Sequence, residues 1–434
     1  MRRKNPLLAV FSTVLIDMLG FGILIPVFPL LISPGSPFRV TPETWSFTKG
    51  LIMLGWLQGT YPLCIFLAAP ILGQLSDRHG RRPVLALSIF GTAIGYFMFA
   101  IGIVTKNIPL LFASRALDGL TGGNLAVANA AIGDISTNEN RAKNFGALGA
   151  AFGIGFVVGP YLGGKLSTPH VSFYGLFHTP GWFGATTPFW FACGMSLVNC
   201  LLILTTLPET LAQKVEGGRI AIGRALHNVK AGFTSDRLRI ALLSMFLFSG
   251  GFTFFTSFFG VYLRNNFGFN ASKTGDYFAY VGIFIAFAQA VIVRKVAPHL
   301  PDWKVLRFSM FGTAAVLAIF FFAPAGNNLW VYLPVPFFAA FNGLSMANSQ
   351  SLISRSAEMG KQGEAMGISS SVSSLAQVPA SVLVGYITSG ITSAQPLIVA
   401  SLCITAGGLV FLLLFKPKYV MDTPAGAAPA GAAH

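Results

Sequence analysis

The sequence predicts an all-α integral membrane protein with twelve transmembrane helices in two six-helix bundles. Hydrophobic residues make up 53% of the 434-residue chain and charged residues only 10%, whereas an ordinary soluble domain is about 25% charged. The apolar residues gather in twelve long runs, and a helix that spans a membrane needs about 20 of them. A polar segment after the sixth run divides the twelve into two equal sets.

Each apolar run is predicted to be helical, because backbone groups in lipid must satisfy their own hydrogen bonds. A barrel strand would need only about ten residues of alternating polarity. The first run follows Arg2, Arg3 and Lys4, but it is too long for a signal peptide and lacks a small-residue cleavage site, so we expect a retained span. In chain order the runs cover residues 6–32, 50–74, 84–105, 108–135, 145–166, 184–207, 238–263, 273–296, 304–324, 328–354, 363–390 and 394–415.

The polar segment sets the predicted domain boundaries. It covers residues 208–237 and is predicted to be a cytoplasmic linker between a bundle at 1–207 and a second bundle at 238–418. The tail at 419–434 is composed largely of alanine, glycine and proline and is predicted to be disordered.

The basic residues predict the orientation in the membrane. With the N-terminus inside, 22 of the 29 Lys and Arg residues fall in inner segments, six fall in outer segments and Arg115 alone lies within a span. Inner loops of membrane proteins carry such an excess. Both termini are therefore predicted to be cytoplasmic, in a plasma membrane such as the bacterial inner membrane. The net charge of +15 then reflects topology, because a nucleic-acid binder would gather its basic residues on one soluble face.

The sequence offers no pattern for a cofactor, a metal site or an enzyme. The four cysteines lie in apolar runs without metal-ligand spacing, and the six histidines lie outside the runs. No GxSxG or HExxH motif occurs. An intramembrane enzyme or a receptor remains a remote alternative to a transporter.

The loop between the second and third runs reads GQLSDRHGRRP, residues 73–83. Basic residues that only fix orientation would not require its glycines and its acid. Gly73 allows two helices to approach closely, Asp77 can cap or face the positive end of a neighbouring helix, and Gly80 permits a tight reversal. These residues predict a cytoplasmic gate, whose arginines can reach carboxylates or helix C-termini: Arg78, Arg81 and Arg82.

Charged residues within the spans are candidates for the functional site. Arg115 and Asp118 are three residues apart and share a helix face. Asp17 lies inside the apolar stretch FSTVLIDMLGFG with no charged neighbour in sequence. Charges within a span are rare and normally face a cavity or a transport pathway. Arg115 is therefore either a local partner of Asp118 or also faces Asp17 across the first bundle.

The fifth run contains GALGAAFGIGFVVGPYLGG, residues 146–164. Small residues four apart allow close packing of helix backbones, and the proline adds a possible kink. The residues of this motif are Gly149, Gly153, Gly155, Gly159, Pro160, Gly163 and Gly164.

Polar and aromatic residues within other spans are candidates for a substrate pocket. For each of them, helix packing is an equal alternative, and the phenylalanines also suit a surface that faces lipid. They are Gln58, Asn124, Phe252, Phe255, Gln289, Asn342, Gln350 and Gln377.

These motifs resemble those of the major facilitator superfamily. GQLSDRHGRRP is similar to its signature loop, and residues 294–307 are a degenerate echo of that loop in the second half. The pair Arg115 and Gly119 resembles its proton-coupling motif, and GIGFVVGPYLGG resembles the antiporter motif of its exporters, which uptake symporters usually lack. The resemblance implies two parallel halves with a site at their midplane, and an Arg81–Asp134 contact that holds the cytoplasmic side closed.

The first run resembles the first span of tetracycline-type exporters in the drug:proton antiporter family, and the resemblance covers nearly the whole chain. Such exporters carry further acids in the third and ninth spans, where this sequence has Gly95 and Phe311. The matching positions of the first span are Asp17, Gly20, Gly22, Pro26 and Pro29.

The resemblance implies a monomeric secondary transporter that exports a drug-like small molecule, of the tetracycline or multidrug type, in exchange for protons. Burial disfavours the charged form of a carboxylate and a nearby arginine favours it, so Asp17 is predicted to take up and release the coupling proton. Arg115 would tune it, and Asp118 would be a second carboxylate or the partner of the arginine. The alternative is a proton-coupled uptake symporter of a sugar or organic solute.

Overall fold

The predicted helices are present in the computed structural model, which describes residues 6–136, 141–173, 177–211, 221, 223–296, 299–357, 362–390 and 393–416. Every predicted apolar run contains helix within these residues. Ten of the helices described are long and apolar enough to cross a membrane. The other two runs contain α4 with α5, and α6.

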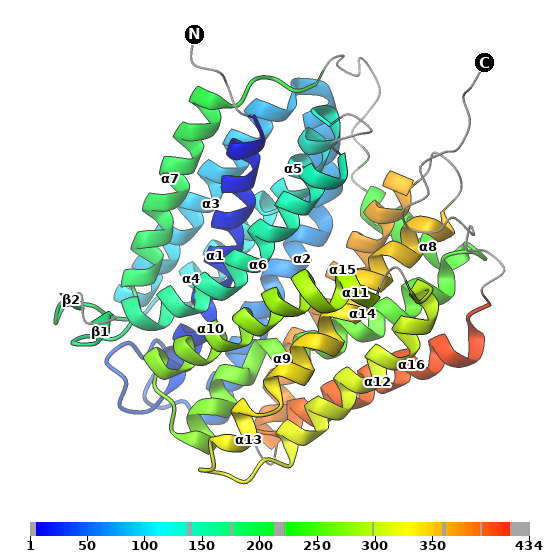
Figure 1. Ribbon diagram of the computed structural model, residues 1–434. Helices are drawn as coiled ribbons and strands as arrows, with labels where there is room; N and C mark the ends of the chain where they lie inside the picture. The colour runs from blue at the N-terminus through cyan, green and yellow to red at the C-terminus, as the bar shows by residue number, and fades with distance from the viewer. Residues whose placement is uncertain are drawn as a thin grey trace, which may run out of the picture.

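The first half of the chain forms one group of packed helices (Figure 1). Its fourth run is two helices rather than one, because two consecutive glycines, Gly122 and Gly123, separate them. A Cβ atom at Gly123 would lie 2.7 Å from the Cα of Ala69 on the neighbouring helix. The elements of this half are α1 (Pro6–Ile32), α2 (Phe47–His79), α3 (Arg81–Val104), α4 (Ile108–Thr121), α5 (Asn124–Asp134), α6 (Arg141–Leu166), β1 (Ser172–Phe173), β2 (Phe177–His178) and α7 (Thr187–Thr206).

The second half forms the other group, and α8 of the predicted linker packs on α15 and α9. Its eighth run changes to a π-helix before a last α-helical turn, a feature that often marks functional positions. The elements are α8 (Arg224–Thr234), α9 (Arg239–Phe267), α10 (Ala271–Phe287), η1 (Ala288–Val293), α11 (Arg294–Val296), α12 (Asp302–Phe321), α13 (Leu329–Tyr332), α14 (Val335–Ser356), α15 (Gln362–Gly390) and α16 (Gln395–Leu414).

The two halves meet mainly through α2 with α15, α6 with α10, and α1 with α9, and also through smaller contacts of α1 with α10 and of α2 with α8. We call the end of the molecule with the β1–β2 hairpin and α13 the loop end, and the end where α1 begins and α16 finishes the terminal end. The halves pack tightly toward the loop end and diverge toward the terminal end (Figure 1). A Cβ at Gly164 would lie 2.4 Å from the carbonyl oxygen of Ala271, and a Cβ at Gly385 would lie 2.6 Å from that of Leu51.

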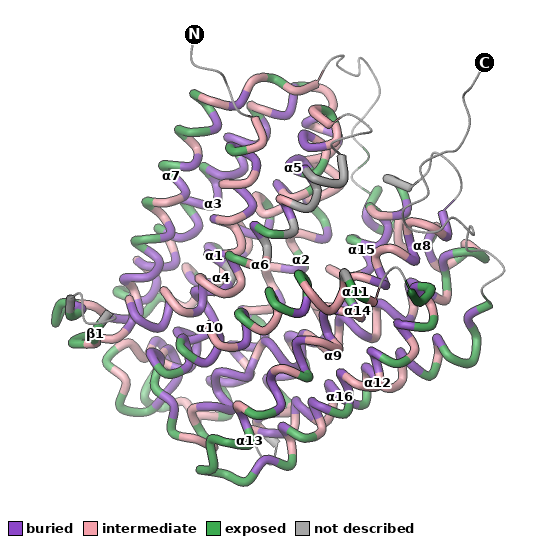
Figure 2. The backbone as a smooth tube through the Cα atoms, viewed as in Figure 1, coloured by how far each residue is buried: buried purple, intermediate pink, exposed green. Residues whose placement is uncertain are grey.

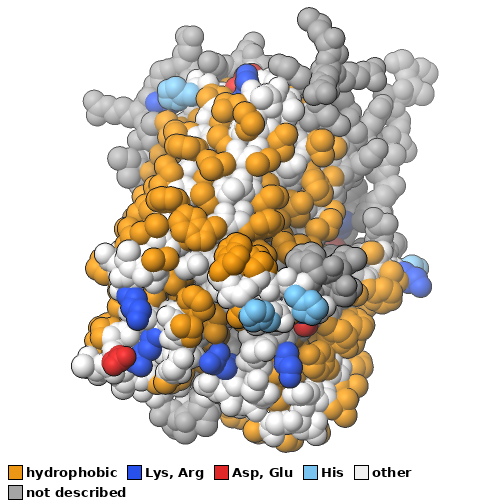
Figure 3. Space-filling model, turned by 90° about the vertical axis from the view of Figure 1, so that its left-hand side faces the viewer, with side chains coloured by type: hydrophobic (Ala, Val, Ile, Leu, Met, Phe, Trp, Pro, Cys, Tyr) orange, Lys and Arg blue, Asp and Glu red, His pale blue; other side chains and the backbone are white. Residues whose placement is uncertain are grey.

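The surface of the molecule suits a bilayer. Buried residues lie between the helices and exposed residues on their outer sides (Figure 2). On the face in Figure 3, hydrophobic side chains cover the middle and charged side chains lie toward the two ends. Large apolar side chains such as Phe97 and Leu201 are exposed, as expected where lipid is the solvent.

Candidate functional site

A cavity lies between the two halves of the chain. Its empty volume, including its opening, is about 580 Å³. Among the described lining residues Arg115 is the only charged one, and the others are apolar, amide or hydroxyl side chains. The lining comprises Leu24, Ile25, Phe28, Gln58, Tyr61, Pro62 and Arg115 from the first half, and Thr253, Thr256, Ser257, Gln377 and Ser381 from the second.

The two halves also touch across this cavity. The side-chain amide of Gln58 on α2 donates a hydrogen bond of 3.0 Å to the backbone oxygen of Ser257 on α9. Gln58 and Gln377, both predicted pocket residues, therefore lie at the cavity on opposite halves. Tyr61 was not among the predicted pocket residues, although its spacing of three residues from Gln58 puts it on the same face of α2.

Arg115 forms an ion pair with Asp118 on its own helix. Its Nη2 lies 2.6 Å from the carboxylate, and both side chains are almost fully buried. The guanidinium also lies over the rings of Tyr61 and Phe99, at 5.4 and 5.2 Å from their centroids. Gly95 on α3 leaves the room for Asp118, because a Cβ there would lie 3.1 Å from the Asp118 Cβ. The local pair is thus the arrangement that the structure contains.

Asp17 lies near the middle of α1 and beside this pair. Its Oδ2 atom is buried and has no hydrogen-bond partner, and the same holds for the Nδ2 atom of Asn124. Asn124 and Asp118 are among the polar side chains that act on it electrostatically. No ion pair joins Asp17 to Arg115 among the described residues, so the alternative in which Arg115 also faces Asp17 stays a prediction. Asp118, which lies one helical turn from Arg115, forms the ion pair with the arginine.

The motif at residues 73–83 forms a compact cluster around Arg81. This side chain lies 2.6 Å from Asp77 and 3.0 Å from Asp134, and also bonds Ser76. The predicted Arg81–Asp134 contact is therefore present. Gly80 has a φ of +104°, the left-handed region in which glycine is favoured, and it makes the predicted tight reversal. All these groups belong to the first half, so the cluster does not join the two halves.

One expectation for this loop was wrong. Nothing lies within 4 Å of a Cβ placed on Gly73, so this glycine does not serve a close approach of two helices. Asp77 pairs with the side chain of Arg81, the first residue of α3. The start of α3 is capped by Glu209, whose carboxylate accepts the backbone N–H groups of Arg81, at 2.8 Å, and of Arg82. Its signal in the sequence was its place directly after the sixth run, in a chain with only 14 acids.

The other two arginines of the loop lie at helix ends. Arg82 bonds the carbonyl oxygen of Leu204 in the last turn of α7, as predicted for a helix C-terminus. Arg78 is half-buried in the last turn of α2.

A related ion pair lies at the corresponding place of the second half. Asp302 at the start of α12 lies 3.4 Å from Arg355 at the end of α14, and it accepts a hydrogen bond of 2.7 Å from Ser351. The sequence showed only a degenerate echo of the loop here.

The glycines of α6 serve two different contacts. Gly155, Gly159 and Gly163 face the backbone of α1, and a Cβ at Gly159 would lie 2.7 Å from the carbonyl oxygen of Leu19. Gly164 instead meets Gly275 of the second half. Pro160 lies inside the helix.

Gly153, in the first part of the glycine motif on α6, does not pack in this way. Gly153 faces open space, so its inclusion in the ridge was wrong. The surroundings of Gly149 lie outside what the structure describes.

Most of the remaining pocket candidates lie away from the cavity. Phe252 stacks with Phe338, and Phe255 packs against the same ring at a tilt. Phe255 is also buried within the second half, which favours helix packing, the alternative to a pocket role. Gln289 is exposed in η1. Asn342 and Gln350 lie on α14, each with a buried oxygen that lacks a partner.

The molecule has two groups of membrane helices with a cavity between them, and a buried charge pair lies at that cavity. This arrangement is typical of membrane transporters. The sequence model of the family described as Major Facilitator Superfamily matches residues 10–381. The chain belongs to the major facilitator superfamily. It is a transporter and not an enzyme, which rules out the enzyme alternative.

Relatives of known name support the resemblance to tetracycline-type exporters. The class C tetracycline resistance protein of Escherichia coli is 29% identical over 392 residues, with 88% of this chain and 90% of that protein covered. The mouse major facilitator superfamily domain-containing protein 10 is 26% identical, with 97% and 94% covered. A crystal structure of the human organic anion transporter MFSD10 matches with a TM-score of 0.70 at 21% identity, covering 95% of this chain and all of that one. At this identity the structural match shows the fold alone.

Proposed function

We propose that this protein exports a drug-like small molecule, of the tetracycline or multidrug type, in exchange for protons. The observation that carries the proposal is the Asp17 carboxylate in α1, whose Oδ2 atom is buried without a hydrogen-bond partner. It lies near Asp118, whose ion-pair partner Arg115 lines the cavity between the halves. An acid within a span is expensive to bury and normally serves a proton or substrate pathway. Relatives named tetracycline resistance proteins, at 26–29% identity, support the substrate class.

Asp17 is the proton site in this mechanism. Its charged form lacks a compensating cation, because Asp118 already holds Arg115 at 2.6 Å. A proton that enters from outside neutralises Asp17, while a substrate in the cavity favours its other charge state, so the two compete. Each elementary charge that crosses the membrane supplies about 2.3 kcal/mol per 100 mV, which can drive export against a gradient.

Arg115 and Tyr61 connect the proton site with the cavity. Both line the cavity, and Tyr61 lies within the electrostatic influence of Asp17, Asp118 and Arg115. Asp118 fixes the orientation of the guanidinium. A change in the charge of Asp17 therefore alters the field at the surface that a bound substrate contacts.

Alternating access follows from relative movement of the two halves. The seam at the loop end is closed by close backbone contact at Gly164 and Gly385. At the terminal end, the open space beside Gly73 leaves room for a helix of the second half to approach. The Arg81 cluster would hold the end of α2 and the start of α3 as one rigid surface for that approach and thereby act as the gate.

The terminal end faces the cytoplasm in this proposal, because 22 of the 29 basic residues fall in segments at that side. The protein acts as a monomer in a plasma membrane such as the bacterial inner membrane, with protons as its coupling ion.

Transport into inverted membrane vesicles tests this function. With the vesicle interior made acidic, we expect uphill uptake of a tetracycline or another drug, which Asp17→Asn abolishes. Glu43→Gln, an exposed acid in the loop before α2, is the matched control and keeps transport. Uphill transport by Asp17→Asn would overturn the assignment of the proton site, and sugar or organic-solute accumulation in right-side-out vesicles under an inward proton gradient would show a symporter instead.

A further inference from the structure

A second hollow lies on the outer surface, between α12 and α16 at the terminal end. Its empty volume, including open space, is about 740 Å³. Phe308, Phe311 and Leu412 form its apolar part, and Phe308 is 76% exposed. Trp303, Lys304 and Arg307 form its other part. We call these six residues the α12–α16 groove.

Among the described residues, the cations of the groove have no carboxylate partner. No acidic side chain is among the described lining residues. The neighbouring Asp302 is buried and held by Arg355 and Ser351, so it does not neutralise Lys304 or Arg307. The Nε atom of Arg307 is buried without a hydrogen-bond partner. A desolvated donor of this kind costs free energy unless something supplies an acceptor.

Trp303 contacts both cations and indicates how deep they lie in the bilayer. Lys304 and Arg307 lie over its ring, 5.4 and 4.7 Å from the centroid. Tryptophan is enriched at the level of the lipid headgroups. From Arg307, the next turn along α12 presents Phe311, so the groove changes from cationic to apolar in the direction from the terminal end toward the bilayer core.

We propose that the α12–α16 groove binds an anionic phospholipid of the leaflet at the terminal end. The phosphate and the negative headgroup contact Lys304 and Arg307, and an acyl chain lies along Phe308, Phe311 and Leu412. Basic pockets beside membrane helices recognise anionic headgroups, and the apolar part of the groove selects a lipid over a soluble phosphate. This site is separate from the cavity between the halves and does not depend on the transported substrate.

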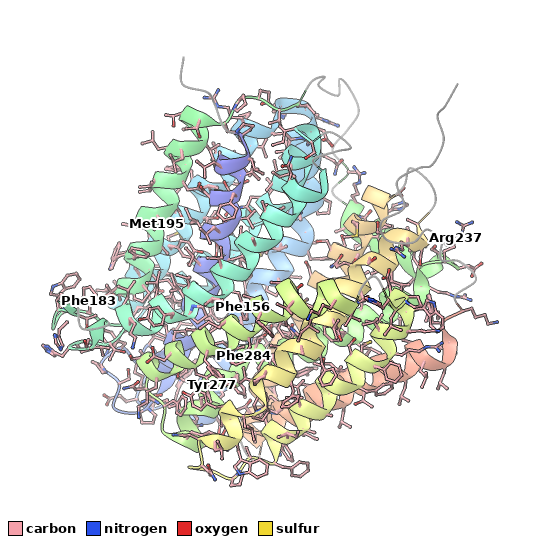
Figure 4. The ribbon with its side chains drawn as sticks, in the orientation of Figure 1. Phe156, Phe183, Met195, Arg237, Tyr277 and Phe284 are labelled. Atoms are coloured by element: carbon pink, nitrogen blue, oxygen red, sulfur yellow. The ribbon has the colours of Figure 1, made fainter. Side chains whose placement is uncertain are left out.

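Native mass spectrometry of the purified full chain tests the site, with phosphatidylglycerol and phosphatidylcholine as probes. We expect tighter binding of phosphatidylglycerol, weakened about fivefold by Arg307→Gln and up to about 30-fold by Lys304→Gln with Arg307→Gln. The matched control is Arg237→Gln, an exposed cation at the same end of the molecule (Figure 4), which leaves binding unchanged.

Equal binding of the two lipids, or unchanged phosphatidylglycerol binding in the double variant, would overturn the proposal. So would displacement of the lipid by millimolar inorganic phosphate, since the site would then take a soluble anion. A second measurement uses lipids with brominated acyl chains, which quench nearby tryptophans. Brominated phosphatidylglycerol should quench the fluorescence more than brominated phosphatidylcholine, and Trp303→Phe should remove the difference. A persistent difference would place the lipid elsewhere and reject the groove.

Discussion

The membrane-embedded centres of the two halves differ in chemistry. The first half buries Arg115 and Asp118 within its spans and holds there the half-buried Asp17, whose Oδ2 atom is buried. Within the described residues, the second half has charged side chains only near the ends of its long helices, and its aromatic rings form a cluster that extends from the middle of α9 toward the loop end. The cluster includes Phe255, Phe259, Tyr277 (Figure 4), Phe320 and Phe338.

This difference indicates a division of labour in the proposed mechanism. A titratable group needs polar neighbours and a route for protons, and the first half supplies those. Interlocked aromatic rings resist deformation, so the second half can move as a rigid body and contribute only amides and hydroxyls to the cavity, such as Gln377 and Thr256.

The ion pairs at the terminal end have their arginine and their acid at exchanged positions in the two halves. In the first half the arginine starts the third span and the acid ends the fourth, as Arg81 and Asp134. In the second half the acid starts the ninth span and the arginine ends the tenth, as Asp302 and Arg355. The corresponding pair of helices is thus joined in both halves, but with the positive and negative residues exchanged. The attraction between the two positions therefore matters more than which residue carries which charge.

The largest effect is expected from removing the titratable group of the first half. Asp17→Asn should lower proton-driven transport at least 100-fold and abolish the dependence of the remaining flux on pH. Gln377→Ala, at the cavity surface of the second half, should lower proton-driven transport only about two- to fivefold. The variant loses at most a neutral hydrogen bond to the substrate, worth about 1 kcal/mol or less. Initial rates in vesicles between pH 5.5 and 8.5 measure both, and equal losses would refute the division of labour.

Breaking the buried ion pair should destabilise the first half strongly. Asp118→Ala leaves Arg115 as an uncompensated buried charge, and such changes cost about 3–5 kcal/mol. The double substitution Arg115→Met with Asp118→Leu should recover most of that stability while transport stays impaired. Thermal unfolding in detergent measures stability, and a double variant no more stable than Asp118→Ala would contradict this account.

Closure at the loop end should depend on the seam between α6 and α10. Among the described residues, the one ion pair that joins the halves is Lys165 with Asp276, at 2.9 Å, and Lys165 also bonds Ser272. Lys165→Ala should shift the population toward opening at this end about three- to tenfold, because a half-buried pair contributes about 1 kcal/mol. Spin-label distances between the β1–β2 hairpin and α13 report the shift, and the exchange Lys165→Asp with Asp276→Lys should reverse it.

The smallest effects should come from charge exchange at the terminal end. Asp302→Arg with Arg355→Asp should retain transport within about twofold, whereas either single change should lower it about three- to tenfold. Arg81→Asp with Asp134→Arg should recover less, because Arg81 also holds Asp77 and Ser76. Equal recovery in both halves would show that these extra contacts do not matter.

The sequence by itself determined the helical membrane fold, the two-part organisation and the family. Those features follow from run length, overall polarity and motifs that are local in the chain, such as Gly80 with its reversal. The contact between Arg81 and Asp134 was also accessible, because the resemblance to a known family supplied the pairing.

Only the tertiary structure decided which side chains face the cavity and which carboxylate forms the ion pair with Arg115. A period of 3.6 residues shows that Phe255 and Gln377 lie on helices but not which way each helix is turned. The rotation of each helix about its axis is set by packing against neighbours far away in sequence. This packing directs the side chain of Phe255 toward the aromatic core and that of Tyr61 toward the cavity. In the same way, the missing side chain of Gly95 gave Asp118 its place and left Asp17 without a cation.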